Sequence, residues 1–281
     1  MVCTESHAEV NRISKEAHTK HPPKALPSEG VALQGGTDMR IGIRGHDLAA
    51  HTPQKLCAAL QSLQVQEIQL VVHKSFPDFT YSEENIRSIA DIFRQYGIQI
   101  AVYGCYIDPL SDEGQARFHE HIRYAQLLNA GCIATETALG VTTAQNDEAR
   151  YQALVPVFRR FADDAAAHGV RCAVETVWVH PICSPEKTAR LFADVGSDNL
   201  YAILDPVNLL ENEAVPHREE KTQRAIELYG DKILAVHWKD AQADAADPAI
   251  QFACKNPAVT VITEGLTGER LSTVLSQLRR I

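Results

Sequence analysis

The sequence has no apolar segment that approaches the roughly 20 residues needed to span a bilayer as a helix. Its first residues also lack the apolar core of a secretory signal. These two absences exclude the common membrane and secreted classes of protein. We therefore expect a cytoplasmic protein that has no membrane partner.

Positive charge is scarce. The chain carries 27 Lys and Arg residues against 36 Asp and Glu residues, which gives a net charge of −9 and an isoelectric point near 5.7. Because nucleic-acid binding normally requires a basic face, we expect no nucleic-acid partner. A small-molecule substrate is the expected partner, and the sequence leaves homodimer and homotetramer both open.

Paired cysteines are also missing. The seven cysteines are odd in number and none forms a Cys-x-x-Cys pair. This pattern indicates neither a disulfide framework nor a zinc knuckle. We interpret the cysteines as small apolar residues of the core.

The chain divides at Met39. Residues 1–38 contain few apolar residues and no sustained period, which predicts a flexible, disordered N-terminal extension. From Met39 onward, apolar strand-like runs alternate with longer amphipathic segments. We therefore expect one domain over residues 39–281, in a chain close to the roughly 250 residues of an eight-stranded α/β barrel plus a tail.

The alternation of strands and helices predicts an α/β fold built from parallel βα units. Eight such units can close into a barrel, so the predicted architecture is a single (β/α)8 TIM barrel. The predicted strands cover residues 40–44, 67–72, 98–103, 132–136, 170–175, 200–205, 233–237 and 259–264.

Four of these strands end in a residue that can bind a metal ion. They are Glu175, Asp205, His237 and Glu264, which are separated by 30, 32 and 27 residues. Each separation corresponds to one strand, loop and helix, so the four residues lie on neighbouring strands five to eight. Since barrel active sites lie at the carboxyl ends of the strands, we expect the four side chains to bind one divalent ion.

The residue types indicate the chemistry. A set of three carboxylates and one imidazole suits Mn²⁺, Mg²⁺, Co²⁺ or Zn²⁺ and leaves positions open for substrate. Such an ion stabilises the enediolate that forms when a proton is removed from carbon beside a carbonyl. Glu175 and Glu264 are the predicted catalytic residues, which take and return that proton as general base and acid.

Further polar residues fall at the predicted mouth of the barrel. Arg44, Lys74 and Lys239 are predicted to bind a carboxylate or phosphate of the substrate. His180, on the loop after Glu175, and Asp240, which follows Lys239, are further predicted substrate-binding residues. Each of these side chains has an alternative interpretation as a solvated charge or structural residue at the rim.

The segments AVET, ILDPVNLL, AVHWKD and VITEGL resemble the xylose isomerase-like TIM barrel superfamily, in its sugar phosphate isomerase/epimerase branch. The resemblance covers roughly Met39 to Ile281. It implies that Glu175, Asp205, His237 and Glu264 bind one divalent metal ion and that both glutamates exchange protons with substrate. It names no substrate, because related proteins isomerise, epimerise, dehydrate or cleave.

The chain departs from this pattern in two places. Ketose 3-epimerases of the group carry a substrate-binding histidine where this chain has Asn208, which weakens a 3-epimerase assignment and makes Asn208 the predicted substrate-binding residue there. The segment DAQADAADPAIQFACKNP also lacks the arginine and the glycines found before strand eight in those enzymes.

Three alternatives remain open at the level of sequence. One is a dehydratase on the same barrel. Another is a hydrolase resembling apurinic/apyrimidinic endonucleases, which use extra histidines where this chain offers Tyr103 or Cys105, Glu136 and Asn208. The last is a barrel that binds a ligand without turnover. The most strongly favoured function is a metal-dependent isomerase or epimerase of a small sugar or hydroxy-keto compound.

Overall fold

The structure is a computed structural model that describes residues 39–140, 142, 147–210 and 216–281. The predicted N-terminal extension, residues 1–38, lies outside the described residues. Within the described residues, eight parallel strands close into a barrel in sequence order, β1 pairing with β8. The strands are β1 (Arg40–Arg44), β2 (Glu67–Leu70), β3 (Gln99–Gly104), β4 (Cys132–Thr135), β5 (Arg171–Glu175), β6 (Leu200–Leu204), β7 (Ile233–Trp238) and β8 (Thr260–Thr263).

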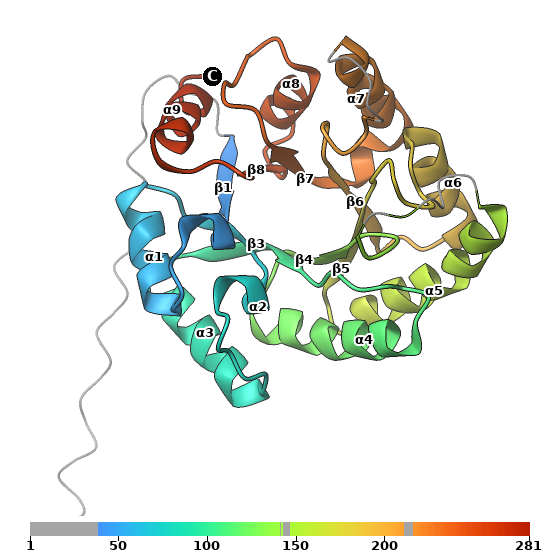
Figure 1. Cartoon of the computed structure of the whole chain (residues 1–281), viewed down its shortest axis with the longest axis horizontal. Coiled ribbons are helices and arrows are strands. Elements are labelled where there is room, and N and C mark those ends of the chain that lie inside the picture. The colour runs from blue at the N-terminus through green and yellow to red at the C-terminus, as the bar shows by residue number, and fades with distance from the viewer. Residues whose placement is uncertain (1–38, 141, 143–146, 211–215) are drawn as a thin grey trace, which may run out of the picture. The chain divides into compact units, whose positions relative to one another are not determined.

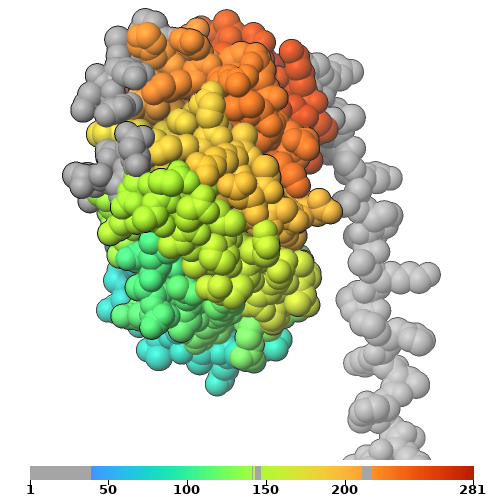
Figure 2. Space-filling model, turned by 90° about the vertical axis from the view of Figure 1, so that its right-hand side faces the viewer, coloured from blue at the N-terminus to red at the C-terminus, as the bar shows by residue number. Residues whose placement is uncertain are grey.

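Helices surround this ring of strands, as Figure 1 shows. Their bounds are α1 (Pro53–Ser62), α2 (Val72–Ser75), α3 (Glu83–Gln95), α4 (Asp112–Leu127), α5 (Glu148–Ala167), α6 (Pro185–Val195), α7 (Pro216–Tyr229), α8 (Pro248–Lys255) and α9 (Gly268–Leu278). The described residues also form two short 3₁₀ helices, η1 (Gly45–Leu48) and η2 (Gly230–Lys232). On the side of the barrel seen in Figure 2, consecutive segments lie next to one another in chain order. The predicted TIM barrel is therefore confirmed.

Local sequence signals explain where several helices begin. Ser82 and Ser184 each precede a helix, and their side chains accept hydrogen bonds from the backbone N–H groups of Asn85 and Lys187. This N-cap satisfies an amide that has no partner within the helix. Pro185 occupies the first turn of α6, where its missing N–H costs nothing.

The strand bounds differ from the predicted ones by at most two residues at either end. The largest difference is in β2, which ends at Leu70, because the chain turns into α2 at Val72. Val71 and Val72 are fully or almost fully buried, so the apolar run continues after the strand has ended. Hydrophobicity alone therefore could not mark this boundary.

Two apolar clusters hold the barrel together. The larger one includes residues of the strands and of the inward faces of the surrounding helices, for example Phe118 on α4 and Phe161 on α5, whose ring centroids are 4.2 Å apart. The smaller cluster consists of strand residues that fill the barrel interior: Val102, Cys132, Ala134, Ala173, Ile203, Ala235 and Ile262. No described helix is both long and apolar enough to cross a membrane.

The interior cluster explains why polar side chains gather above it. Side chains on a strand alternate between its two faces, so residues i and i+2 point to the same side. Ala173, Ile203 and Ala235 lie in the interior, and the residues two positions later are Glu175, Asp205 and His237. The same step leads from Ile262 to Glu264 and from Ala134 to Glu136. A polar layer at the carboxyl end of the barrel therefore follows from strand geometry.

Candidate metal centre

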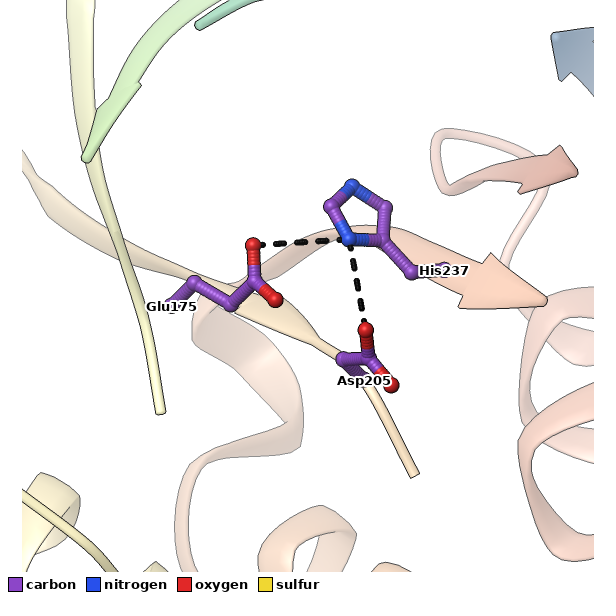
Figure 3. Close-up of side chains that lie close together, drawn as sticks. All are labelled: Glu175, Asp205 and His237. Carbon is purple, nitrogen blue, oxygen red and sulfur yellow. Dashed lines mark ion pairs between the residues drawn. The ribbon is translucent and has the colours of Figure 1, made fainter. Parts of the chain in front are cut away.

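Three of the four predicted metal ligands come together closely. Glu175, Asp205 and His237 are all buried, with exposed fractions of 3%, 1% and 1%. Each offers one ligand atom, and these atoms lie within 4.8 Å of one another. His237 Nδ1 lies 3.4 Å from Glu175 Oε2 and 3.7 Å from Asp205 Oδ2, so the imidazole faces both carboxylates (Figure 3).

Backbone hydrogen bonds orient Asp205. Its Oδ1 accepts hydrogen bonds from the N–H groups of Val207 and Asn208, each 3.0 Å away. The other oxygen, Oδ2, therefore points toward His237. The turn that begins at Asp205 thus fixes which carboxylate oxygen faces the centre of the barrel.

The group fits a divalent metal ion. Buried polar atoms normally have hydrogen-bond partners, yet Asp205 Oδ2 and both ring nitrogens of His237 have none. A mixed set of carboxylate and imidazole donors suits Mg²⁺, Mn²⁺ or Zn²⁺. These buried atoms without hydrogen-bond partners can serve as metal ligands, and this observation favours a metal ion at this position.

Glu264, the fourth predicted ligand, lies beside this group with a different orientation. It follows β8 directly, and its N–H donates to the carbonyl of Trp238 at 2.9 Å. Its Oε2 is 3.2 Å from His237 Nδ1, whereas Oε1 forms an ion pair of 2.5 Å with Arg44. Glu264 therefore borders the three-residue group and turns one oxygen toward the rim.

Positive charges balance this acidic centre. The ammonium group of Lys239 lies 2.7 Å from Asp205 Oδ2 and 3.2 Å from Glu264 Oε1. The contact between Lys239 and Asp205 is an ion pair whose geometry is not that of a hydrogen bond. Burial opposes a charge on Lys239, but Asp205 and Glu264 outweigh this effect and raise its pKa.

The same balance acts on His237. Burial disfavours the imidazolium, but the nearby carboxylates of Glu175, Asp205 and Glu264 raise the pKa of His237 to about 10. For Asp205, burial opposes ionisation, while His237 and Lys239 favour it and lower the pKa overall. Without a metal ion the centre therefore holds a protonated histidine beside an ionised aspartate.

A cavity of about 470 Å³ opens above the centre. Five of the predicted substrate-binding residues line it: Arg44, Lys74, His180, Asn208 and Lys239. Asn208 connects them to the metal centre, because its Nδ2 donates to Glu175 Oε1 at 2.6 Å and its Oδ1 accepts from Lys239 at 3.0 Å. The structure thus brings these five residues together with Glu175 and Glu264.

Asp240 is placed differently. It does not line the cavity, and its carboxylate pairs with Arg218 of α7. Arg218 also lies 3.5 Å from Asp247, which caps α8 through Ala249. The immediate partner of Asp240 is therefore a helix of the outer ring.

Other residues of the cavity wall were harder to predict from the sequence. Tyr106 lies two residues beyond β3, and its hydroxyl accepts a hydrogen bond from Gln69 at 2.8 Å. Lys74 lies over the ring of Tyr106, 5.1 Å from its centroid. Tyr106 lies in an irregular segment after β3, so only its closeness to a strand end could have drawn attention to it.

The match to a family model decides the classification. The model of the xylose isomerase-like TIM barrel matches residues 57–262, more than half of the chain. The chain belongs to this family. A search of curated protein sequences found no match.

Several solved structures share this fold at low sequence identity. D-psicose 3-epimerase from Clostridium cellulolyticum H10, solved with D-tagatose, is 14% identical with a TM-score of 0.65, covering 86% of this chain and 91% of that chain. 3-Keto-D-glucoside 4-epimerase from E. coli is 15% identical with a TM-score of 0.69, covering 86% and 100%. A xylose isomerase-like protein from Mycobacterium smegmatis, solved in complex with magnesium, is 16% identical with a TM-score of 0.64, covering 85% and 94%. The structures that share this fold therefore include two sugar epimerases and a protein solved in complex with magnesium.

Proposed function

We propose that the protein is a divalent-metal-dependent isomerase or epimerase of a small sugar or hydroxy-keto compound. The observation that carries this proposal is the pair of carboxylates at the floor of the cavity. Glu175 Oε2 and Glu264 Oε2 lie 3.4 Å and 3.2 Å from the same atom, Nδ1 of His237. Two carboxylates so close to one centre can remove a proton from a carbon atom and return one to it.

The surrounding residues support different roles for the two glutamates. Glu175 is held by the amide of Asn208, a neutral hydrogen-bond donor. Glu264 is held by Arg44 and lies close to Lys239, both positively charged. Lys239 and Asn208 also line the cavity, where they can orient the oxygen atoms of a substrate.

Glu175, Asp205 and His237, with Glu264 beside them, are the proposed ligands of the metal ion. When bound, a divalent ion supplies electrostatic stabilisation of negative charge on substrate oxygens. The proton itself moves between the substrate carbon and Glu175 or Glu264, through an enediolate. The presence of sugar epimerases and of a magnesium complex among the similar structures supports this proposal.

Proton exchange with solvent tests the function. Metal-loaded protein is incubated in D₂O with D-fructose, D-tagatose or hydroxypyruvate, and deuterium at carbon is followed by NMR. We expect at least one compound to incorporate deuterium, and Asp205→Ala to abolish the exchange. If no compound exchanges, the proposal gives way to a non-catalytic barrel. Loss of water from the compound would indicate a dehydratase, and loss of a carbon fragment would indicate a lyase.

A further inference from the structure

A second cavity lies at the amino-terminal ends of the barrel strands. Its volume is about 420 Å³, and its lining includes Arg40, Gln99, Arg171 and Thr260, which are the first residues of β1, β3, β5 and β8. The residues of the candidate metal centre lie at the other ends of their strands, and the strands are parallel. The two cavities are therefore at opposite ends of the barrel, and the proposed function does not use this one.

Strand geometry places polar side chains at this end of the barrel interior. Arg171 and Thr260 lie two positions before Ala173 and Ile262, which belong to the interior apolar cluster. Because residues i and i+2 of a strand point to the same side, both polar residues continue the inner face of the barrel. A second polar layer thus borders the apolar interior on the side away from the metal centre.

The lining of this cavity contains three arginines and no acidic residue. The arginines are Arg40, Arg94 and Arg171, in a chain whose net charge is −9. Two of them have carboxylate partners that lie outside the lining: Arg40 pairs with Glu67, and Arg94 pairs with Asp91. The third arginine determines the net charge of the cavity.

Arg171 carries a positive charge that no carboxylate balances. Its Nε donates to the carbonyl oxygen of Gly131 at 2.8 Å, and its guanidinium lies 5.9 Å from the ring centroid of Tyr201. Among the described residues, Arg171 forms no ion pair with an acidic side chain. The side chain is half-buried and accessible from the cavity. A guanidinium in this setting favours an anionic ligand, because it forms strong charge-assisted hydrogen bonds with carboxylate and phosphate oxygens.

Two amide side chains add hydrogen-bond donors to the wall. Gln99 and Asn129 are exposed, and within the part of the chain that the structure describes their side chains have no hydrogen-bond partner. Each amide can donate two hydrogens to a ligand. The rest of the lining is largely apolar and includes Phe93, Ile100 and Leu234. The cavity therefore offers a positive charge and neutral donors beside an apolar surface.

We propose that this cavity binds a small organic anion, whose carboxylate or phosphate group contacts Arg171 and whose apolar part lies against the wall. The volume of about 420 Å³ is that of a site for a small molecule. A cationic ligand is repelled by the arginines. A neutral ligand leaves the charge of Arg171 without a partner. The inference concerns a site separate from the catalytic cavity and is independent of the proposed function.

Calorimetric titration of the full-length protein with phenyl phosphate and with benzoate tests the proposal. We expect one site per chain with a dissociation constant of roughly 1 mM or lower for at least one of these probes. Inorganic phosphate, which lacks the apolar part, and benzyl alcohol, which lacks the charge, should each bind more weakly. The affinity should be the same with and without Mn²⁺, because the site lies away from the metal centre. Whichever probe binds more tightly identifies the anionic group.

Substitutions locate the binding site. Arg171→Met should weaken binding about tenfold or more, because it removes the charged donor, whereas Arg171→Lys retains part of the affinity. Asn129→Gly should weaken binding about threefold, the effect of one neutral hydrogen bond. Asn129 has a φ of 51°, which glycine adopts without strain, so this variant should fold even if Arg171→Met does not.

Arg117→Met is the matched control. Arg117 is an exposed arginine of α4 that pairs with Glu113, and its removal should leave the affinity unchanged. The proposal is overturned if neither phenyl phosphate nor benzoate shows saturable binding below about 20 mM. It is equally overturned if Arg171→Met and Asn129→Gly bind as the unaltered protein does, or if binding requires Mn²⁺. None of these results bears on proton exchange at the other end of the barrel.

Discussion

Glu175 and Glu264 have the same side chain but are held by different groups. A neutral amide, Asn208, contacts Glu175, whereas Arg44 and Lys239 neutralise Glu264. A change from Glu to Gln keeps the shape and one oxygen in both cases but removes the ability to carry a proton. The two substitutions therefore separate proton transfer from folding.

We predict that Glu175→Gln and Glu264→Gln each lower turnover by a factor of about 10² or more, the usual scale for a positioned acid or base. Both variants should fold and retain some metal, because an amide oxygen can still bind an ion. Initial rates, metal content and circular dichroism check this. A variant that keeps full turnover would show that its glutamate moves no proton.

The raised pKa of His237 leads to a pH dependence. A metal ion needs the neutral imidazole, so binding must release the proton that His237 holds up to a pH of about 10. Metal affinity should therefore rise about tenfold per pH unit between pH 7 and 8.5. The folding stability of the metal-free protein changes with pH in the opposite direction. The charged His237 stabilises the folded state fully below the ordinary pKa of histidine, and this stabilisation is lost as pH rises through about 10.

Calorimetric titration with Mn²⁺ at several pH values measures this slope. His237→Gln is the control, since its amide has no proton to release in this range and should give a flat plot. An equally flat plot for the unaltered protein would mean that His237 has its ordinary pKa.

The first turn of α4 packs closely against the preceding loop, and a substitution at Gly114 tests this packing. The N–H of Gly114 donates to Ser111 Oγ at 3.0 Å, and a Cβ atom at Gly114 would lie 2.1 Å from the carbonyl oxygen of Asp108. Alanine normally stabilises a helix relative to glycine by about 1 kcal/mol. Here the clash outweighs that gain.

We predict that Gly114→Ala lowers the free energy of unfolding by about 1–3 kcal/mol, as overpacking does. Urea unfolding measures the change. Ala116→Gly, at an exposed position of the same helix, is the comparison and should cost about 1 kcal/mol from helix propensity alone. A stabilised Gly114→Ala would contradict the packing described for this turn.

The order of elements could be predicted because each βα unit carries its own periodicity. Active sites of such barrels lie at the carboxyl ends of the strands, so Glu175, Asp205 and His237 could be predicted to lie together. The four-residue helix α2 was not predicted, since its buried valines continue the apolar pattern of β2. The direction of a side chain could not be predicted either. Asp240 contacts Arg218, 22 residues earlier in the chain, and this contact depends on where α7 lies in the fold.

For the whole molecule, the sequence predicts that residues 1–36 contribute little to the barrel domain, because they lack a core-forming pattern. Deletion of these residues should leave the melting temperature, metal content and turnover nearly unchanged. Differential scanning calorimetry of the two chains measures the first of these. A large fall in melting temperature would show that this segment packs against the barrel.

The central claim is that Glu175, Asp205 and His237 bind a divalent ion, and elemental analysis tests it most directly. Protein is loaded with Mn²⁺, desalted and compared with Asp205→Ala, which removes the buried Oδ2. We predict about one ion per chain in the unaltered protein, with a higher melting temperature because the ion binds the folded state, and loss of both in the variant. A chain without bound metal, or metal content unaffected by Asp205→Ala, would contradict the account.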